Sequence, residues 1–255
     1  MGIYNCAPTL AEALDSLYAQ TFQDFKIILC EDGSTDDTYT VAKSYADKHD
    51  NIILVRNEKN MGLNYTLNHC LEYADTEYCA RMDGDDISLP TRFAKEVEFL
   101  DAHPEYAIVT TPMKHFDING VYRVGKGGFE PRLTDFPKNS PFCHAPCMVR
   151  TEAYRAVGGY TVAENLLREE DYHLWIKMYQ KGFRGYTLKE PLYMMRDDRN
   201  AAKRRTFKAR KNEAYVKHLA VKLLGLPFYY HVYCLKPLIL GIMPTWLYNV
   251  VYKLK

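Results

Sequence analysis

The chain lacks an uninterrupted run of about 20 apolar residues, which is the length that a membrane-spanning helix requires. It opens without a signal peptide. Its seven cysteines are odd in number, scattered through apolar stretches and without metal-ligand spacing, which argues against a disulfide framework and a zinc site. We therefore expect reduced cysteines in a cytoplasmic globular protein, in keeping with 47% hydrophobic and 25% charged residues.

Excess charge is also absent overall, because the net charge is only +1, but the charges are unevenly distributed. Of 33 lysines and arginines, 11 lie in residues 203–255, together with only one of the 32 acidic residues. Residues 1–202 are therefore acidic, which argues against a nucleic-acid channel there. The basic tail favours an anionic partner such as a membrane surface.

Strand and helix patterns alternate through the first half of the chain. Apolar runs predict strands at Phe25–Cys30, Ile52–Val55, Tyr78–Met82 and Ala107–Thr111. Helices are expected between them, and residues 1–5 predict the end of a strand that begins earlier. This alternation is typical of an α/β fold with a doubly wound, mostly parallel sheet flanked by helices.

Smaller signals complete this outline. Thr9 and Glu12 form a capping-box pattern, with Thr9 as the N-cap of the first helix. Residues 116–141 are rich in turn formers and predict irregular structure.

Two acidic stretches follow predicted strands. The first is Glu31–Asp37, and the second is Asp83-Gly84-Asp85-Asp86. Carboxylates this close repel one another, so the second stretch is a costly structural choice unless a cation lies there. A hard divalent ion bridging a substrate diphosphate fits, since such ions prefer oxygen ligands. Ligands in α/β folds gather at the carboxyl ends of strands, which favours a site over a solvated turn.

A third acidic group, Glu169-Glu170-Asp171, begins a predicted helix. Carboxylates at a helix N-terminus are stabilised by the helix dipole, so capping alone explains one or two of them. Three in a row leave one available for proton transfer.

The tail, residues 203–255, combines basic and aromatic residues with prolines. Short amphipathic helices of this composition suit a membrane interface. A helical cap packed on the domain is the alternative, and we favour peripheral contact with anionic lipids on the inner face of the cell membrane.

Together these motifs resemble the family 2 inverting glycosyltransferases with a GT-A fold, especially bacterial polysaccharide and capsule enzymes. The resemblance runs from about Gly2 to Arg199. Its markers, in order, are Tyr4-Asn5, Gln20-Thr21-Phe22, Glu31-Asp32-Gly33-Ser34-Thr35-Asp36, Asn60-Met61-Gly62, Arg81-Met82-Asp83-Gly84-Asp85-Asp86 and Glu170-Asp171.

The resemblance implies roles for these residues. Asp83-Gly84-Asp85 resembles the family's DxD motif, in which Asp85 would bind Mn²⁺ or Mg²⁺ and Asp83 would contact the metal and the donor. His144 matches a histidine near the family's metal site, although a core histidine is an equal alternative. Asp171 matches the catalytic base, with Glu170 beside it. The remaining donor-binding positions are Tyr4, Asn5, Asp32, Asn60, Gly62 and Arg81, of which Tyr4 and Asp32 would contact the nucleoside.

The implied function is transfer of one sugar, with inversion, from a nucleotide-diphosphate donor. A UDP-sugar is the expected donor, and a lipid-linked or polysaccharide molecule is the expected acceptor. Residues 1–115 would bind the donor, 116–202 the acceptor, and 203–255 would form the helical tail. The processive Gln-x-x-Arg-Trp motif is missing, which favours a single transfer per encounter. The alternatives are a sugar nucleotidyltransferase and a truncated, inactive nucleotide-sugar-binding module.

Overall fold

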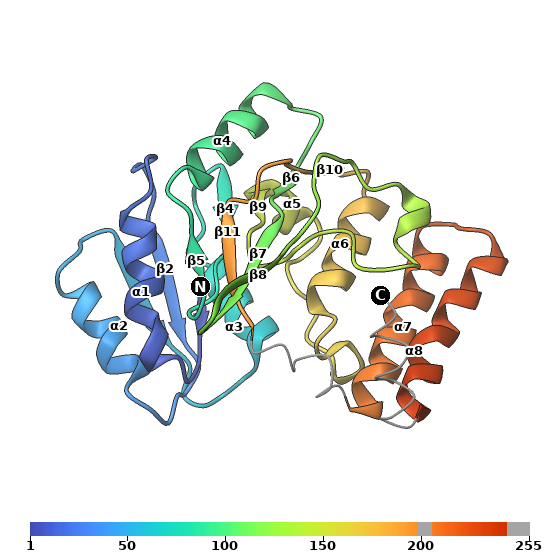
Figure 1. The fold of residues 1–255 in the computed structure, drawn as a ribbon, viewed down its shortest axis with the longest axis horizontal. Helices are drawn as coiled ribbons and strands as arrows, with labels where there is room; N and C mark the ends of the chain where they lie inside the picture. The colour runs from blue at the N-terminus through green and yellow to red at the C-terminus, as the bar shows by residue number, and fades with distance from the viewer. Residues whose placement is uncertain (198–205, 244–255) are drawn as a thin grey trace.

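A computed structural model describes residues 1–197 and 206–243, in which strands and helices alternate along the chain (Figure 1). The strands are β1 (Gly2–Ile3), β2 (Ile27–Glu31), β3 (Ile52–Arg56), β4 (Tyr78–Ala80), β5 (Ile87–Ser88), β6 (Ile108–Thr110), β7 (Met113–Asp117), β8 (Gly120–Val124), β9 (Met148–Arg150), β10 (Gly185–Thr187) and β11 (Tyr193–Arg196). The α-helices are α1 (Ala7–Tyr18), α2 (Thr38–Ala46), α3 (Leu63–Leu71), α4 (Arg92–Ala102), α5 (Thr151–Ala156), α6 (Glu170–Gln180), α7 (Phe207–Leu223) and α8 (Val232–Ile242). Short 3₁₀ helices are η1 (Leu133–Asp135), η2 (Glu164–Leu166) and η4 (Phe228–His231).

The first sheet has the order β1-β2-β3 and is entirely parallel. Gly2 pairs with Cys30, and Ile27 pairs with Ile52. Its central strand is a continuous apolar run up to Glu31, as expected of a strand covered on both faces. Ile27 and Leu29 pack in one core cluster with Leu10 and Leu14 of α1.

The other two sheets are mixed. One has the order β10-β6-β9-β4, in which β9 runs antiparallel to both neighbours. The other has the order β5-β11-β7-β8, in which only β11 and β7 are parallel. The α/β class is thus confirmed. The sheets differ from a doubly wound parallel arrangement because strands after residue 112, such as β8 and β9, pair antiparallel with their neighbours.

Two local predictions were wrong. Residues 116–141 are not simply irregular, because β7 and β8 form a hairpin with the two-residue turn Ile118-Asn119. Gly120, which begins β8, has a φ of 102°. Thr9 is not an N-cap, because α1 begins at Ala7 and Cys6 is its N-cap. The Thr9 hydroxyl instead bonds to the carbonyls of Cys6 and Gly84.

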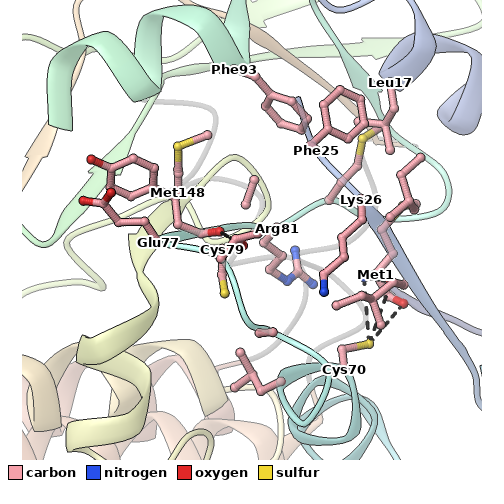
Figure 2. Close-up of a pocket in the computed structure, with 18 of the residues that line it drawn as sticks. Met1, Leu17, Phe25, Lys26, Cys70, Glu77, Cys79, Arg81, Phe93 and Met148 are labelled. Atoms are coloured by element: carbon pink, nitrogen blue, oxygen red, sulfur yellow. Dashed lines mark hydrogen bonds between the residues drawn. The ribbon is translucent and has the colours of Figure 1, made fainter. Parts of the chain in front are cut away.

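A cavity of about 440 Å³ lies between β2 and β4 (Figure 2). It is lined by apolar side chains from α1, α3 and α4 and by residues of both strands. Strand β1 is only two residues long, so it fills a small part of the space between these neighbours.

Helix α7 packs against α6, and α8 lies beside α7 at the end of the molecule opposite α1 and α2 (Figure 1). Val216 and Ala220 of α7 join the core cluster around Trp175. Lys217 is buried and donates to the carbonyls of Pro137 and Lys138. Part of the tail therefore forms the helical cap that the sequence left as an alternative. The aromatic residues Trp246, Tyr248 and Tyr252 lie outside the described residues.

Within residues 1–197 and 206–243, no helix combines the length and the apolar character needed to cross a membrane.

Candidate active site

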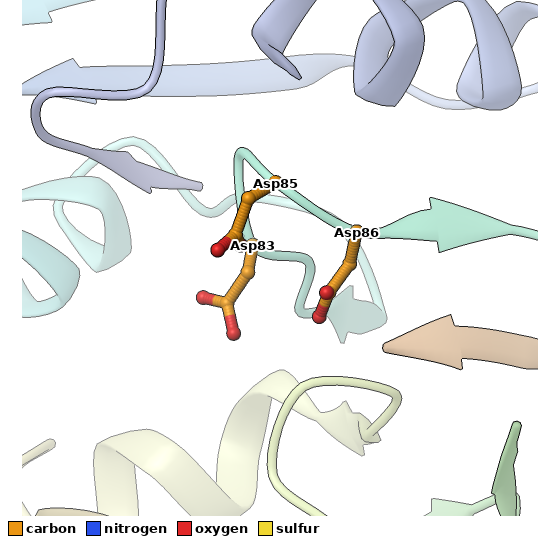
Figure 3. A group of neighbouring side chains, drawn as sticks. All are labelled: Asp83, Asp85 and Asp86. Carbon is orange, nitrogen blue, oxygen red and sulfur yellow. The ribbon is translucent and has the colours of Figure 1, made fainter. Parts of the chain in front are cut away.

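The acidic turn, defined as Asp83–Asp86, links β4 to β5. Its three aspartates each offer a carboxylate oxygen, and these oxygens all lie within 4.8 Å of one another. Figure 3 shows the side chains projecting to the same side of the turn. The exposed Asp85 lies between the half-buried Asp83 and the buried Asp86. The turn thus gathers the oxygen ligands that the sequence predicted at this strand end.

Arginines hold two of these aspartates in place. Arg81 is buried and donates two hydrogen bonds to Asp83, at 3.0 and 2.6 Å. The backbone amide of Arg196, on β11, donates to Asp86 Oδ1 at 2.8 Å. The Arg196 Nε donates to the Asp85 carbonyl at 2.9 Å rather than to its carboxylate. The turn is therefore ordered by cationic residues while the Asp85 carboxylate stays accessible.

The negative charges of the acidic turn repel one another. Burial, reinforced by the neighbouring charges of Asp83 and Asp85, raises the pKa of Asp86 to about 7. Burial and the charge of Asp83 also raise the pKa of Asp85. Three converging carboxylates, of which Asp85 and Asp86 have raised pKa values, suit a hard divalent cation, which would stabilise their anionic forms. The residues present thus fit such an ion, with Asp83, Asp85 and Asp86 as candidate ligands.

The acidic turn packs directly on the end of β1. A Cβ atom at Gly84 would lie 2.7 Å from Cys6 Sγ and 3.3 Å from Ile3, so glycine allows this close approach. The Thr9 hydroxyl donates to the Gly84 carbonyl at 3.0 Å. The position of the turn therefore depends on β1 and the start of α1.

The donor loop, defined as Glu31–Asp37 and named for the role that the sequence predicts for it, begins at the last residue of β2 and is tied to the end of β1. Asn5 Oδ1 accepts the Thr35 amide at 2.9 Å, and the Asn5 amide donates to the Ser34 hydroxyl at 3.1 Å. Asn5 adopts a φ of 47°, a conformation that asparagine tolerates better than most residues. Tyr4, beside it, is 45% exposed and available to a ligand.

Asp32 is buried and holds the neighbouring loop. Its carboxylate accepts the Asn57 side-chain amide at 2.7 Å and the amides of Met61 and Gly62 at 2.8 and 2.9 Å. Asn60 Oδ1 also accepts the Gly62 amide, and Gly62 has a φ of 89° at the start of α3. The predicted residues Asp32, Asn60 and Gly62 therefore form one hydrogen-bonded unit, and the contacts of Asp32 show a positioning role.

Asp171 lies in the first turn of α6 and keeps part of its surface exposed. Burial, together with the charge of Glu170, raises the pKa of Asp171 to about 6, whereas the charge of Arg81 lowers it. Arg81 also binds Asp83, so one arginine acts on both Asp83 and Asp171. The structure thus links the predicted base electrostatically to the acidic turn.

His144 does not belong to the aspartate cluster of the acidic turn. Among the described residues, the only cluster of potential metal ligands is the three aspartates. His144 Nε2 is 2.8 Å from the Tyr160 hydroxyl, and its ring packs edge-on against Trp175. Burial, aided by the charge of Arg81, holds the pKa of His144 well below its usual value. The half-buried His144 ring is thus held by Tyr160 and Trp175, and its role as a metal ligand stays a prediction.

Sequence reasoning missed four residues of this region. Asp86 was read only as part of the motif, although its carboxylate completes the cluster. The Tyr193 hydroxyl accepts a hydrogen bond from the Asp83 amide at 3.2 Å. The Arg196 amide donates to Asp86, and the Tyr160 hydroxyl lies 2.8 Å from His144 Nε2. Tyr193 and Arg196 lie on β11, about 110 residues from the turn, and only the strand pairing of β11 with β5 brings them close.

Comparison with known proteins identifies the family. Residues 1–158 match the model of glycosyl transferase family 2. The chain is 43% identical to the putative glycosyltransferase EpsE of Bacillus subtilis, over 99% of this chain and 91% of the relative. It is 31% identical to the amylovoran biosynthesis glycosyltransferase AmsE of Erwinia amylovora, over 85% of this chain and 82% of the relative.

Solved structures agree on the fold. TarS of S. aureus in complex with UDP-GlcNAc superposes with a TM-score of 0.71 and 20% identity, over 94% of this chain and 70% of that one. The mannosyltransferase PcManGT of Pyrobaculum calidifontis, in complex with GDP-Man and Mn²⁺, gives a TM-score of 0.65 and 18% identity, over 99% and 77%. The chain therefore belongs to glycosyl transferase family 2, and it is a glycosyltransferase with a GT-A fold.

Proposed function

We propose that the enzyme moves one sugar from a nucleotide-diphosphate donor to an acceptor hydroxyl, with inversion at the anomeric carbon. The observation that carries the proposal is the link through Arg81 between Asp83 of the acidic turn and Asp171 at the head of α6. A base and a diphosphate site on either side of one sugar are what a direct displacement needs. Membership of the family sets the sugar nucleotidyltransferase alternative aside.

In this proposal Asp171 takes the proton of the acceptor hydroxyl as its oxygen bonds to the anomeric carbon. The bond from that carbon to the diphosphate oxygen breaks, and its electron pair leaves with the nucleoside diphosphate. A single displacement inverts the anomeric configuration, whereas retention would need a second nucleophilic step. A base with a pKa of about 6 is deprotonated near neutral pH yet basic enough to accept a proton.

Asp83, Asp85 and Asp86 would hold a divalent cation, Mn²⁺ or Mg²⁺, whose charge would neutralise the departing diphosphate. Arg81 supports an anionic ligand in the same place. Its guanidinium is buried, and its Nε has no hydrogen-bond partner among the described residues. This nitrogen can donate to a polar group that enters the site.

We propose a UDP-sugar as the donor. TarS, which shares the fold, is solved with UDP-GlcNAc, and a relative from Escherichia coli, 26% identical over 71% of this chain, is named a UDP-Glc:α-D-GlcNAc-diphosphoundecaprenol β-1,3-glucosyltransferase. That name also supports a lipid-linked acceptor. The exposed Tyr4 and the end of β1 would lie against the base, with Asp32 holding the loop behind it.

The test is the variant Asp171→Asn, assayed for transfer from UDP-sugars and for UDP binding. We expect transfer to fall by about 10² to 10⁴-fold, because the base is lost while the site keeps its shape. UDP affinity should change less than twofold. Glu152→Gln, which removes an exposed acid from the first turn of α5, is the matched control. Transfer by Asp171→Asn at the wild-type rate would contradict the assignment of the base.

We further propose that η4 and α8 contact an anionic membrane, where a lipid-linked acceptor would reside. Their exposed side chains include Phe228 at 83%, Leu235 at 53% and Ile242 at 74%. Exposed apolar groups beside the basic excess of residues 203–255 suit an interface with anionic lipids.

Vesicle binding tests this surface. Leu235→Glu combined with Ile242→Glu should reduce pelleting with phosphatidylserine vesicles at least tenfold, without changing UDP binding. Ile118→Glu, at a fully exposed apolar site on the β7–β8 turn, is the control. Undiminished pelleting of the double variant would contradict the membrane contact.

A further inference from the structure

We propose that Arg92 of α4 is a positioning residue for the acidic turn. Its guanidinium bonds to the Arg81 carbonyl, where the chain leaves β4, and packs on Tyr193, which binds the Asp83 amide. Both supports at the entry to the turn would therefore depend on one side chain. The inference rests on the proposed role of the acidic turn as the site of the metal and the diphosphate.

The antiparallel ladder between β4 and β9 opens at Arg81. The last pair of the ladder is Ala80 with Met148. The same register places Arg81 opposite Cys147, and the Arg81 amide donates to the Cys147 carbonyl at 2.8 Å. In a regular ladder such a pair exchanges two hydrogen bonds. The Cys147 amide instead donates to the His144 carbonyl at 3.1 Å, which leaves the Arg81 carbonyl to another donor.

Arg92 supplies that donor from α4. Its Nη2 lies 2.9 Å from the Arg81 carbonyl oxygen and 3.5 Å from that of Cys147. The Arg92 side chain is fully buried, and a buried carbonyl that lost this donor would carry the cost of its lost hydration. The guanidinium therefore fixes the path by which the chain leaves the sheet and enters the turn.

Tyr193 carries the second support. The Arg92 guanidinium carbon lies 5.1 Å from the centre of the Tyr193 ring, a distance typical of a cation–π contact. Tyr193 is buried on β11, and its hydroxyl accepts the Asp83 amide at 3.2 Å. Arg92 thus acts on the carbonyl of Arg81 directly and on the amide of Asp83 through Tyr193. These two backbone groups flank Met82 and set the direction in which the aspartates project.

Glu96 holds the guanidinium in this orientation. Arg92 Nε donates to the two Glu96 carboxylate oxygens at 3.1 and 3.3 Å, and both side chains are fully buried. Apolar side chains of similar volume often stabilise a fold as well as a buried ion pair does. What this pair adds is direction, because the planar fork of arginine bonds to Glu96 through Nε and to Arg81 through Nη2 at once. A lysine has no such fork.

Gln20 fixes the same helix at the other end of the turn. Its Oε1 accepts the Phe93 amide at 3.0 Å. Its Nε2 donates to the carbonyls of Ser88 and Leu89 at 3.3 and 2.9 Å. The start of α4 is therefore tied to β5, into which the acidic turn leads. This tie keeps Arg92 at a fixed place relative to both ends of the turn.

The test compares Arg92→Lys with Leu100→Ala, which removes a buried side chain about two turns further along the same helix. Both variants should lower Tm. In metal-free protein, amide exchange at Asp83 should be at least tenfold faster in Arg92→Lys and within twofold of wild type in Leu100→Ala. The Mn²⁺-dependent affinity for UDP, measured by calorimetry well below either Tm, should fall at least tenfold in Arg92→Lys alone.

A second variant, Arg92→Met combined with Glu96→Leu, replaces the ion pair by apolar side chains that a core can hold. It lacks the donor to Arg81 and should show the same rapid exchange at Asp83, whether or not Arg92→Lys folds. Exchange at Asp83 that stays at the Leu100→Ala rate in this double variant would overturn the proposal. Because this readout needs no metal, wild-type protein without Mn²⁺-dependent UDP binding would contradict the proposed metal role alone.

Discussion

The donor loop, Glu31–Asp37, and the acidic turn, Asp83–Asp86, have similar compositions but differ in how far the protein itself binds their carboxylates. In the donor loop the protein itself satisfies the buried acids: Arg56 and Ser34 bind Glu31, and three donors bind Asp32. In the acidic turn, Asp85 is exposed and has a raised pKa, and the three carboxylates converge on one another. Donors of the protein therefore bind the buried acids of the donor loop, whereas the converging carboxylates of the acidic turn would be stabilised by a further cation.

This difference separates positioning from binding. A carboxylate such as that of Asp32, which already accepts three hydrogen bonds, can fix a loop but has little capacity left for a cation. Asp83 accepts two hydrogen bonds, both from one guanidinium, and Asp85 remains exposed. Burial and neighbouring like charge, which raise the pKa of Asp85 and Asp86, disfavour their anions, and a bound cation would stabilise them. Composition alone would assign both stretches to the same role, and the partners of each carboxylate distinguish them.

The largest effect should follow from removing a charge in the acidic turn. Asp85→Asn should lower transfer at least 100-fold, because the cation that neutralises the leaving diphosphate would lose a ligand. Thermal stability should be unchanged or higher, since repulsion in the turn is reduced. Steady-state assays at saturating Mn²⁺ would measure the loss. Asp37→Asn, the same change at an exposed residue of the donor loop, should leave transfer near wild type.

The next effect should appear in stability when the donor loop is altered. Asp32→Asn should reduce the free energy of unfolding by about 2–4 kcal/mol, because an amide cannot accept from Asn57, Met61 and Gly62 together. Urea denaturation would measure the change against Asp37→Asn. A loss below 0.5 kcal/mol would show that these three bonds contribute little.

A change in stability of similar size but opposite sign is expected for Asp86→Asn. The folded-state pKa of Asp86 is raised to about 7, so the folded protein holds this proton more tightly than the unfolded chain does. The anion therefore destabilises the fold at pH 8, and the destabilisation fades as the pH falls toward 4. In EDTA, Asp86→Asn should be more stable than wild type by about 4 kcal/mol at pH 8 and nearly equal at pH 4. Equal stability at both pH values would contradict the repulsion.

The smallest effect should be seen in the pH profile of transfer. Asp171 must be deprotonated to act as base, and its pKa is raised to about 6. The rate should therefore fall about tenfold for each pH unit below this value and level off above it. A profile flat down to pH 4.5 would indicate another base.

Much of the site was predictable because it depends on the ends of strands. Asp32 and Asp85 could be assigned to the same edge, since carboxyl ends of parallel strands meet there. The role of Asp32 could not be assigned, because its partners Met61 and Gly62 bind through backbone amides that any sequence would supply.

Residues that reach the site through pairing of distant strands could not be predicted from the sequence. Nothing in the spacing of Tyr193 and Arg196 indicates that β11 pairs with β5 and delivers both to the acidic turn. The β7–β8 hairpin was missed although Asn119-Gly120 is a strong local hairpin signal. The neighbouring glycines and prolines are typical of loops, and they led to a prediction of irregular structure. Thr9 matched a capping pattern, yet its hydroxyl bonds to Gly84, a contact across the fold.

The most direct test of the contrast between the two acidic stretches is calorimetric titration of UDP in the presence and absence of Mn²⁺. Wild-type protein and Asp37→Asn should bind UDP much more tightly with Mn²⁺ than without it. Asp85→Asn should lose at least tenfold of this Mn²⁺-dependent affinity and keep the weak metal-independent part. Undiminished Mn²⁺-dependent UDP binding by Asp85→Asn would contradict the assignment of the acidic turn as the metal and diphosphate site.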